Sequence, residues 1–256
     1  MERQPIKPID LNTDLGEHDG AGFAEDEALL DVVSSASIAC GGHAGNPDVI
    51  RRTVRAATER SVSVGAHPSY PDRDGFGRRP LDIALDALAS SVEDQIRLVA
   101  RSCARENSVM KFVKLHGALY NLAADDRNVA AAMAACIAGV DARLAVLALP
   151  GSEMETAARN AGLAVAREGF IDRAYTPAGR LVPRDFAGAV IGDAATASAR
   201  AIRMALDSMV AAIDGTEIIV AVDSLCVHSD SANALDILCT TRRTLEAAGV
   251  TIRAFA

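Results

Sequence analysis

The sequence predicts an α/β protein in which strands and helices alternate around a closed or distorted (β/α) barrel. Short apolar runs of strand length alternate with longer segments of helical period along the whole chain. Seven or eight such units can be counted, which favours a barrel over an open doubly wound sheet. No Pro/Gly/Ser-rich linker divides the 256 residues, and 50% of them are hydrophobic. We therefore expect a single domain, 1–256, with one large core.

The apolar runs place eight strands, and the helical segments lie between them. The expected strands lie near residues 8–14, 36–40, 62–67, 110–116, 144–149, 163–168, 217–223 and 250–255. The expected helices lie near residues 25–35, 47–60, 82–106, 126–139, 152–161, 193–213 and 232–248. Two long connections, 67–82 and 169–193, contain Arg, Asp and aromatic residues, so we expect functional loops there and not disorder.

Composition restricts the partners and the compartment. The formal net charge of -8 argues against nucleic acid, because phosphate binding needs clustered Lys and Arg. The chain start has no apolar signal core, and no later segment approaches the roughly 18 apolar residues of a membrane span. Five scattered cysteines suggest neither a disulfide framework nor a zinc ribbon. We expect a cytoplasmic, soluble protein with a small-molecule or protein partner, and a homo-oligomer remains open.

The first expected strand, IDLNTDLGE, places Asp10, Asn12 and Asp14 on one face, because side chains alternate along a strand. In a barrel these groups would point inward toward the mouth, since unpaired buried carboxylates are costly. The alternative is an edge strand with a solvated face.

The second strand runs into a glycine-rich turn and a helix. Asn46 suits the helix cap and Pro47 the first turn. Backbone amides of this turn can hold a carboxylate or phosphate. The alternative is that Gly41, Gly42 and Gly45 only permit a tight turn. The pattern matches neither common nucleotide motif, so no P-loop is present.

The third and fourth strands contribute histidines from neighbouring strand ends. His67 shares a face with Gly65, and the missing side chain of this glycine leaves space in front of the histidine. Lys114 shares a face with His116 on the next strand. Burial should lower the pKa of Lys114 or His116 toward neutrality and suit either for proton transfer. Each histidine alone is more often a bonded core residue. Together with Asp14 they are also suitable ligands for a divalent metal with an open position.

The last third of the chain adds acidic and basic candidates. Glu168 ends the sixth strand and Arg173 and Arg184 follow it. These arginines can bind a carboxylate or phosphate bidentately or form ordinary surface ion pairs. Asp223 and His228 stand near a further strand end, where surface polarity is an equally good explanation.

Six motifs in order resemble the LamB/YcsF family over almost the whole chain. They are DLNTDLGE, ACGGHAGNP, GAHPSYPD with GFGRR, VKLHGALYN, FIDRAY with GRLVPR, and VDSLCVHSD. The resemblance implies a distorted barrel of the glycoside hydrolase/deacetylase type. It also implies cleavage of 5-oxo-L-proline, a lactam, to L-glutamate with hydrolysis of ATP, in a complex with B and C partners. Without a P-loop, ATP would bind in another way or mainly through a partner.

The resemblance, combined with the strand faces, suggests a division of labour. The expected catalytic residues are Asp10, Asp14, His67, Lys114 and His116. The expected substrate-binding residues are Asn12, Glu17, Gly42, His43, Glu168, Arg173 and Arg184, with His43 and the glycine turn as an anion pocket. Related deacetylases use an Asp-His-His metal site, which by strand order would fall on Asp14, His67 and His116.

The chain departs from the usual family pattern at four positions near this expected site: Gly42, Asn46, Leu115 and Ser229. These differences leave the exact lactam or cyclic amide open. A stand-alone metal-dependent amide hydrolase or deacetylase and a non-catalytic binding subunit are the competing interpretations.

Overall fold

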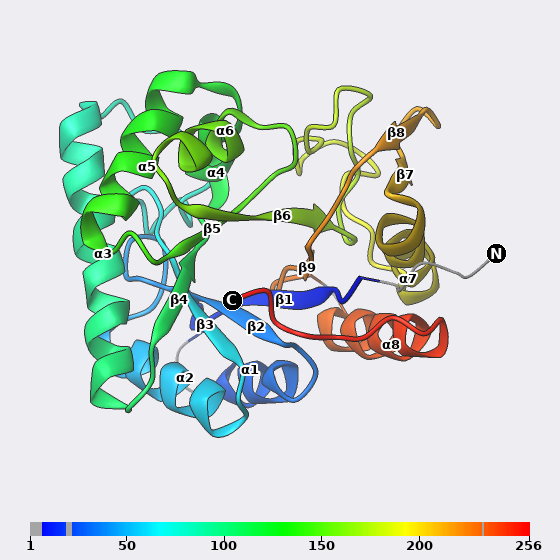
Figure 1. Ribbon diagram of the computed structural model, residues 1–256, viewed down its shortest axis with the longest axis horizontal. Coiled ribbons are helices and arrows are strands. Elements are labelled where there is room, and N and C mark those ends of the chain that lie inside the picture. Colours follow the sequence, from blue (N-terminus) through cyan, green and yellow to red (C-terminus); the bar gives the residue numbers. More distant parts are fainter. Residues whose placement is uncertain (1–6, 19–21, 232) are drawn as a thin grey trace.

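The computed structural model describes residues 7–18, 22–231 and 233–256 and confirms the α/β barrel (Figure 1). Within these residues seven parallel strands close a barrel in the order β1-β2-β3-β4-β5-β6-β9. The barrel strands are β1 (Asp10–Leu15), β2 (Ser35–Ala39), β3 (Ser63–His67), β4 (Met110–Val113), β5 (Ala145–Ala148), β6 (Ala164–Phe170) and β9 (Ser224–Val227).

Helices cover the outside of the barrel, and their apolar faces pack on the strands (Figure 1). The helices are α1 (Phe23–Leu30), α2 (Pro47–Glu59), α3 (Leu85–Arg105), α4 (Gly117–Asp125), α5 (Arg127–Val140), α6 (Glu153–Asn160), α7 (Ala194–Ile202) and α8 (Ala234–Ala247). Helix α2 starts as expected, because the Asn46 side chain accepts hydrogen bonds from the amides of Asp48 and Val49 and Pro47 follows it. No helix in the described part of the chain is long and apolar enough to cross a membrane.

Strand β1 lies inside the sheet and not at an edge. It pairs with β2 on one side and with β9 on the other, so all six of its residues are buried. The alternative of a solvated edge strand is therefore wrong. Asp10, at the amino end of β1, and Asp14, near its carboxyl end, lie in two different polar surroundings.

The closing strand lies later in the chain than predicted. Residues 224–227 complete the barrel, whereas the expected strand 217–223 contributes only β8 (Glu217–Ile219) to a separate two-stranded sheet. The expected eighth strand, 250–255, makes a single parallel bridge from Ile252 to Ile9. The barrel therefore has seven strands, the lower of the two expected numbers.

The predicted helix 193–213 ends early. After α7 a π-helical turn, Arg203–Asp207, leads to Ser208, whose φ of +55° breaks the helix. The chain then forms β7 (Met209–Ala211), which pairs antiparallel with β8. The turn between them contains Asp214 and Gly215, a dipeptide typical of hairpins, which sequence analysis overlooked.

Helix α4 was not predicted, and it begins directly after His116. Gly117 allows this sharp change of direction with a φ of +56°, and a Cβ there would lie 2.6 Å from Gly77 O. The long loop after β3 is thus packed tightly against the start of α4.

The space in front of Gly65 is filled. A Cβ at this position would lie 2.3 Å from the ring of Phe112, so the glycine makes room for an aromatic side chain of β4 and not for a ligand.

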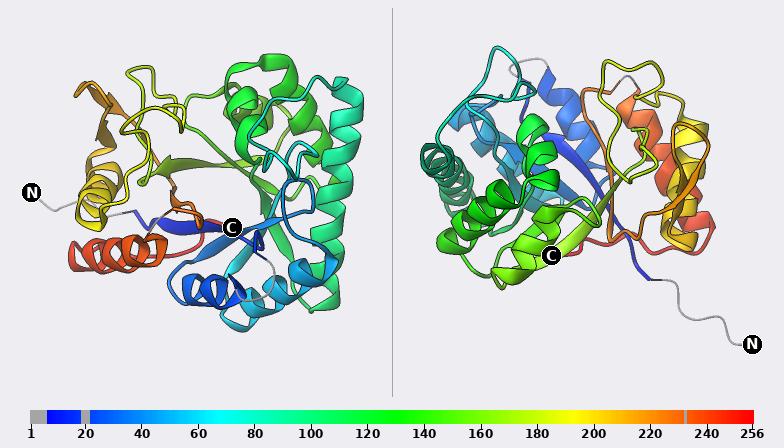
Figure 2. Two further views of the ribbon diagram at one scale, coloured as in Figure 1. Left: turned by 180° about the vertical axis from the view of Figure 1, so that it is seen from behind. Right: turned by 90° about the horizontal axis from the view of Figure 1, so that it is seen from above.

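Both long connections lie at the same end of the barrel, the upper end in the right view of Figure 2. They follow the carboxyl ends of β3 and β6, where barrel proteins carry their sites.

Candidate active site

A cavity of about 520 Å³ opens at the carboxyl ends of the strands. Its walls come from strand ends, from the start of α4 and from both long loops. Six of the residues expected in catalysis or substrate binding line it: Asp14, His67, Lys114, His116, Arg173 and Arg184. Their convergence is the arrangement that barrel topology favours, because parallel strands all end on one face.

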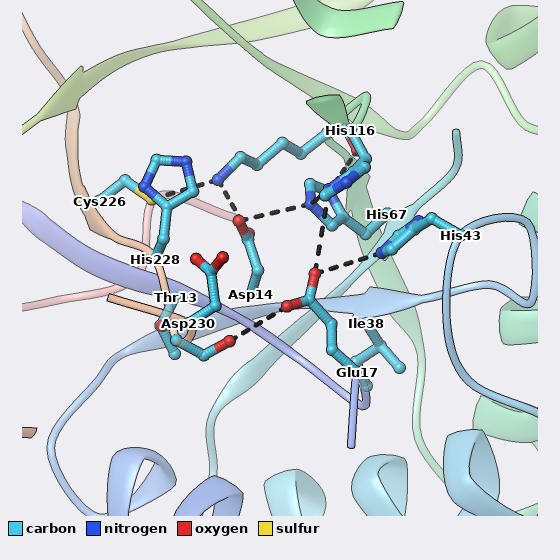
Figure 3. Close-up of polar contacts among 12 residues, drawn as sticks. Thr13, Asp14, Glu17, Ile38, His43, His67, His116, Cys226, His228 and Asp230 are labelled. Atoms are coloured by element: carbon cyan, nitrogen blue, oxygen red, sulfur yellow. Dashed lines mark hydrogen bonds and ion pairs between the residues drawn. The ribbon is translucent and has the colours of Figure 1, made fainter. Parts of the chain in front are cut away.

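Lys114 is fixed between two buried carboxylates. Its Nζ lies 2.8 Å from Asp14 Oδ1 and 3.2 Å from Cys226 Sγ (Figure 3). The same Nζ lies 2.9 Å from Glu168 Oε1. Burial by itself would lower the pKa of Lys114, but Asp14, Cys226 and Glu168 outweigh it and raise the pKa well above its ordinary value. The predicted lowering is wrong for Lys114, which is a permanent ammonium and not a base.

Asp14 is held as a carboxylate. Its Oδ2 lies 3.4 Å from His67 Nε2, and its Oδ1 binds Lys114. Burial opposes ionisation, yet His67 and Lys114 lower the pKa of Asp14 well below its ordinary value. Asp14 therefore stays charged beside the cavity.

Three histidines gather next to Asp14 around the carboxylate of Glu17. His67 Nε2 lies 2.9 Å from His116 Nδ1, and the rings of His43 and His116 stack with centroids 3.7 Å apart (Figure 3). Glu17 Oε1 lies 3.2 Å from His43 Nε2 and 3.9 Å from His116 Nδ1. Burial, together with His67 and His43, lowers the pKa of His116 well below its ordinary value, as predicted, so this ring is neutral.

Asp172 and His228 form a dyad on the opposite wall. His228 Nδ1 lies 2.9 Å from Asp172 Oδ2, which also accepts from the His228 amide and from Ser231 Oγ. Burial by itself would raise the pKa of Asp172, but His228 and Ser231 outweigh it and lower the pKa to about 2. Because the ionised carboxylate only accepts, it fixes the proton on His228 Nδ1 and leaves the Nε2 lone pair for the cavity that His228 lines.

Arginines from both long loops line the outer part of the cavity. Asp230 accepts from Arg78 Nη2 at 2.5 Å and from Arg184 at 3.3 Å, while Arg173 donates to the carbonyls of Val182 and Ala189. Burial, reinforced by Arg184, lowers the pKa of Arg173 to about 10. Arg78 and Arg184 thus share the carboxylate of Asp230, whereas the donors of Arg173 bind main-chain carbonyls, so the outer cavity presents guanidinium groups to a ligand anion.

Asp10 and Asn12 lie deeper in the barrel than predicted. Asp10 accepts hydrogen bonds from the hydroxyls of Ser34, Ser35 and Ser224, and Asn12 donates to Ser224 Oγ. Neither lines the cavity. The structure therefore does not bring Asp10 to the other predicted catalytic groups.

The glycine turn is built differently from the expected anion pocket. The amides of Asp48 and Val49 are already bonded by Asn46 Oδ1, and Arg73 donates to the carbonyl of Gly45. Gly42 packs against the side chains of Ser69 and Gln95, where a Cβ would clash. His43 belongs to the histidine cluster instead.

The other departures from the family pattern have separate surroundings. Ser229 Oγ donates to Glu17 Oε2 at 3.2 Å and so contacts the cluster, while Leu115 is buried in the core and also lines the cavity. Asp223 pairs with Arg167 and does not line the cavity, whereas His228 does.

Sequence analysis missed the parts of the site that depend on loop conformation. Phe76 presents its carbonyl to His116 Nε2 at 2.9 Å and its ring to His43. Arg78 meets Asp230 across 152 residues of chain. Both Phe76 and Arg78 lie in the GFGRR motif, whose glycines and aromatic ring were the available signal.

The fold and cavity define a parallel (β/α) barrel with its polar site at the carboxyl ends of the strands. The likeness to deacetylase barrels is one of fold: the peptidoglycan deacetylase PdaC from Bacillus subtilis superposes with a TM-score of 0.50 at 10% identity, over 97% of this chain and 88% of that one.

The particular family follows from closer relatives. The LamB/YcsF family model matches residues 9–256. The chain is 48% identical over 249 residues to a 5-oxoprolinase A subunit of Agrobacterium fabrum, covering 97% of this chain and 98% of that one. The crystal structure of the lactam utilization protein from Thermus thermophilus gives a TM-score of 0.90 at 42% identity, over 97% of this chain and 100% of that one. The chain belongs to the LamB/YcsF family.

Proposed function

We propose that this chain is the A subunit of an ATP-dependent 5-oxoprolinase that cleaves 5-oxo-L-proline to L-glutamate together with B and C subunits. The names of its relatives support the substrate and the role within a complex. The observation that carries the proposal is the polarity of the cavity, with arginines in its outer part and Lys114, histidines and Asp14 in its inner part.

This polarity fits the two ends of the substrate. The carboxylate of 5-oxoproline would bind Arg173 and Arg184, and the lactam would then reach the inner groups. The cavity volume of about 520 Å³ also suits a small ligand with room for a second group, such as a phosphate.

ATP offsets the difficulty of opening a lactam, which is a resonance-stabilised amide. In the expected route the lactam oxygen attacks the γ-phosphorus and releases ADP, forming a C–O–P bond. Water adds to the activated carbon, the C–N bond breaks with a proton passing to nitrogen, and a second water releases phosphate. The sum is 5-oxoproline, ATP and two waters giving glutamate, ADP and phosphate.

The side chains suit different parts of this route. His228 Nε2, with its tautomer fixed by Asp172, would accept the proton of the attacking water. Lys114 would act as a fixed charge that orients Asp14, because its ammonium is already bonded by Asp14 and Glu168. The arginines would offset the charge of the phosphorylated lactam. ATP itself would bind mainly with a partner subunit.

Reconstitution of the chain with its B and C subunits tests the proposal. Glutamate formation should require ATP, 5-oxoproline and all three subunits, and cyclic analogues lacking the carboxylate should react poorly. His228→Gln should lose most of the rate while retaining substrate binding, since it removes a proton acceptor. If the assembled complex turns over no 5-oxoproline but accepts another cyclic amide, the substrate assignment is wrong.

Stand-alone metal-dependent amide hydrolysis is the second candidate. It is favoured by the carboxylate of Glu17 and the rings of His67 and His116, whose ligand atoms lie within 4.8 Å of one another among the described residues. Amide or acetyl cleavage by the isolated chain, abolished by a chelator and restored by metal, would support it. Inactivity toward such substrates with metal present would exclude it.

A further inference from the structure

The two imidazoles that face each other across the site have fixed tautomers. His67 Nδ1 lies 2.8 Å from the carbonyl of Lys114, and His116 Nε2 lies 2.9 Å from the carbonyl of Phe76. A carbonyl can only accept a hydrogen bond, so these two ring nitrogens carry the protons. The nitrogens that face each other at 2.9 Å, His67 Nε2 and His116 Nδ1, therefore both present lone pairs when the rings are neutral.

Two lone pairs at this distance repel unless a positive species lies between or beside them. A proton on one ring is one solution, and a cation bound between the two rings is the other. Carboxylates surround the pair, with Asp14 Oδ2 3.4 Å from His67 Nε2 and Glu17 Oε1 3.9 Å from His116 Nδ1. These carboxylates would stabilise a cation bound between the rings.

We propose that His67 Nε2, His116 Nδ1 and a carboxylate oxygen of Glu17 bind a divalent first-row transition cation. Two imidazole nitrogens each about 2.0–2.1 Å from a metal are about 2.9 Å apart at a right angle and about 3.4 Å apart at the tetrahedral angle. The observed separation of 2.9 Å is within this range. Two histidines and one carboxylate leave coordination positions open, and both histidines line the cavity.

The deacetylase analogy indicated Asp14 as the carboxylate ligand, but Glu17 is the better carboxylate ligand here. Asp14 already binds the Lys114 ammonium through Oδ1 at 2.8 Å, so this carboxylate is engaged by a cation of the chain itself. Glu17 accepts from His43 Nε2 and Ser229 Oγ, both at 3.2 Å. Among the described residues no lysine or arginine forms an ion pair with Glu17, whose ion-pair partners are the imidazoles of His43 and His116.

The surroundings also hold the ligands in place. The carbonyls of Lys114 and Phe76 orient the two rings, and His43 and Ser229 orient Glu17, as outer partners do in metal sites. The inference rests on the proposed function in that the cation would lie in the same cavity. When bound, it would polarise a carbonyl oxygen or lower the pKa of a water molecule.

Direct binding to the purified, chelator-treated full chain tests the site without reference to activity. Co²⁺ absorption and calorimetry with Zn²⁺ should each give one site per chain. Glu17→Gln should weaken binding by more than the roughly 10- to 100-fold that loss of an outer partner costs, whereas Asp14→Asn should stay within that range. His228→Gln, which removes a cavity histidine outside the ligand set, should bind with unchanged affinity, and circular dichroism checks the fold of each variant.

A second measurement needs no variant. In the wild-type chain Zn²⁺ should shift the ¹⁵N resonances of His67 Nε2 and His116 Nδ1 and leave those of His228 unchanged. Absence of stoichiometric binding would overturn the proposal, as would binding lost in Asp14→Asn and kept in Glu17→Gln. Equal loss in both variants would overturn Glu17 as the single carboxylate ligand. Turnover of 5-oxoproline by a metal-free complex would show that the reaction needs no metal, and it would leave the proposed function intact.

Discussion

One strand of the barrel carries two buried aspartates with opposite properties. Asp10 and Asp14 lie four residues apart on β1, and both are almost completely buried. The lower cluster surrounds Asp10 with the hydroxyls of Ser34, Ser35 and Ser224. The upper cluster surrounds Asp14 with Lys114, His67 and His116.

The difference lies in the partners and in the access to the cavity. Burial outweighs the hydroxyl donors and raises the pKa of Asp10 to about 6, whereas His67 and Lys114 lower that of Asp14 well below its ordinary value. Only the upper cluster faces the cavity. Buried polarity inside a barrel therefore does not by itself identify a site; charged partners beside open space do.

The largest expected effect is on activity in the upper cluster. His116→Ala removes a ring that contacts His67, His43 and the Phe76 carbonyl, and it should reduce 5-oxoproline turnover by about 10²- to 10⁴-fold in the reconstituted complex. Asp10→Asn in the lower cluster is the control and should retain most activity. A similar loss in both variants would show that the two clusters work as one unit.

Lys114→Met should have the largest effect on stability. It leaves the buried carboxylates of Asp14 and Glu168 without their ammonium, at a cost of about 3–5 kcal/mol in the free energy of unfolding. Denaturant unfolding measures this cost. The double variant Lys114→Met/Glu168→Gln should recover part of it, because one buried charge is removed with its partner. No recovery would mean that packing, and not charge, fixes Lys114.

Asp10 in the lower cluster should make the free energy of unfolding depend on pH. The pKa of Asp10 rises from 3.8 to about 6 on folding, so between these values the folded chain binds more protons than the unfolded chain. The protonated Asp10 makes its full contribution to the free energy of unfolding below pH 3.8. This contribution is lost as the pH rises through 6, which is a change of about 3 kcal/mol.

The measurement is the difference between wild type and Asp10→Asn in unfolding free energy from about pH 4 to about pH 7. Titration of His43 and His116 occurs in both proteins and cancels. Asp172, whose pKa of about 2 places its loss of stability below this range, does not interfere. A flat difference curve would show that the three hydroxyls keep Asp10 ionised.

Sequence analysis could place the upper cluster because strand geometry fixes it. His67, Lys114 and His116 end neighbouring parallel strands, and alternation decides which of their neighbours face the barrel axis. The same reasoning could not say that Asp10 lies below the cavity, because alternation gives the face of a strand and not the depth. The pKa of Lys114 was misjudged since its sign depends on Asp14 and Glu168, which are 100 and 54 positions away in sequence.

The closing strand and the arginines depended on information that local patterns lack. The run EIIVAV has stronger strand character than SLCV, yet the hairpin turn at Gly215 takes its first half out of the barrel. Arg78 and Arg184 come from two loops and meet only at Asp230. Loop conformation, unlike strand alternation, has no period that a sequence displays.

The smallest expected effect concerns the arginines, which extend the comparison from the barrel axis to the outer part of the cavity. If Arg184 binds the substrate carboxylate, Arg184→Ala removes a charged hydrogen bond of about 1.5–3 kcal/mol. The KM for 5-oxoproline should then rise about 10- to 100-fold with little change in kcat, since the bond exists in both ground and transition states. Arg127→Ala, at an exposed ion pair with Glu153, is the matched control and should change neither constant. A fall in kcat at constant KM would instead indicate that Arg184 contacts the transferred phosphate during the reaction. The outer part of the cavity would then bind this phosphate and not the substrate carboxylate.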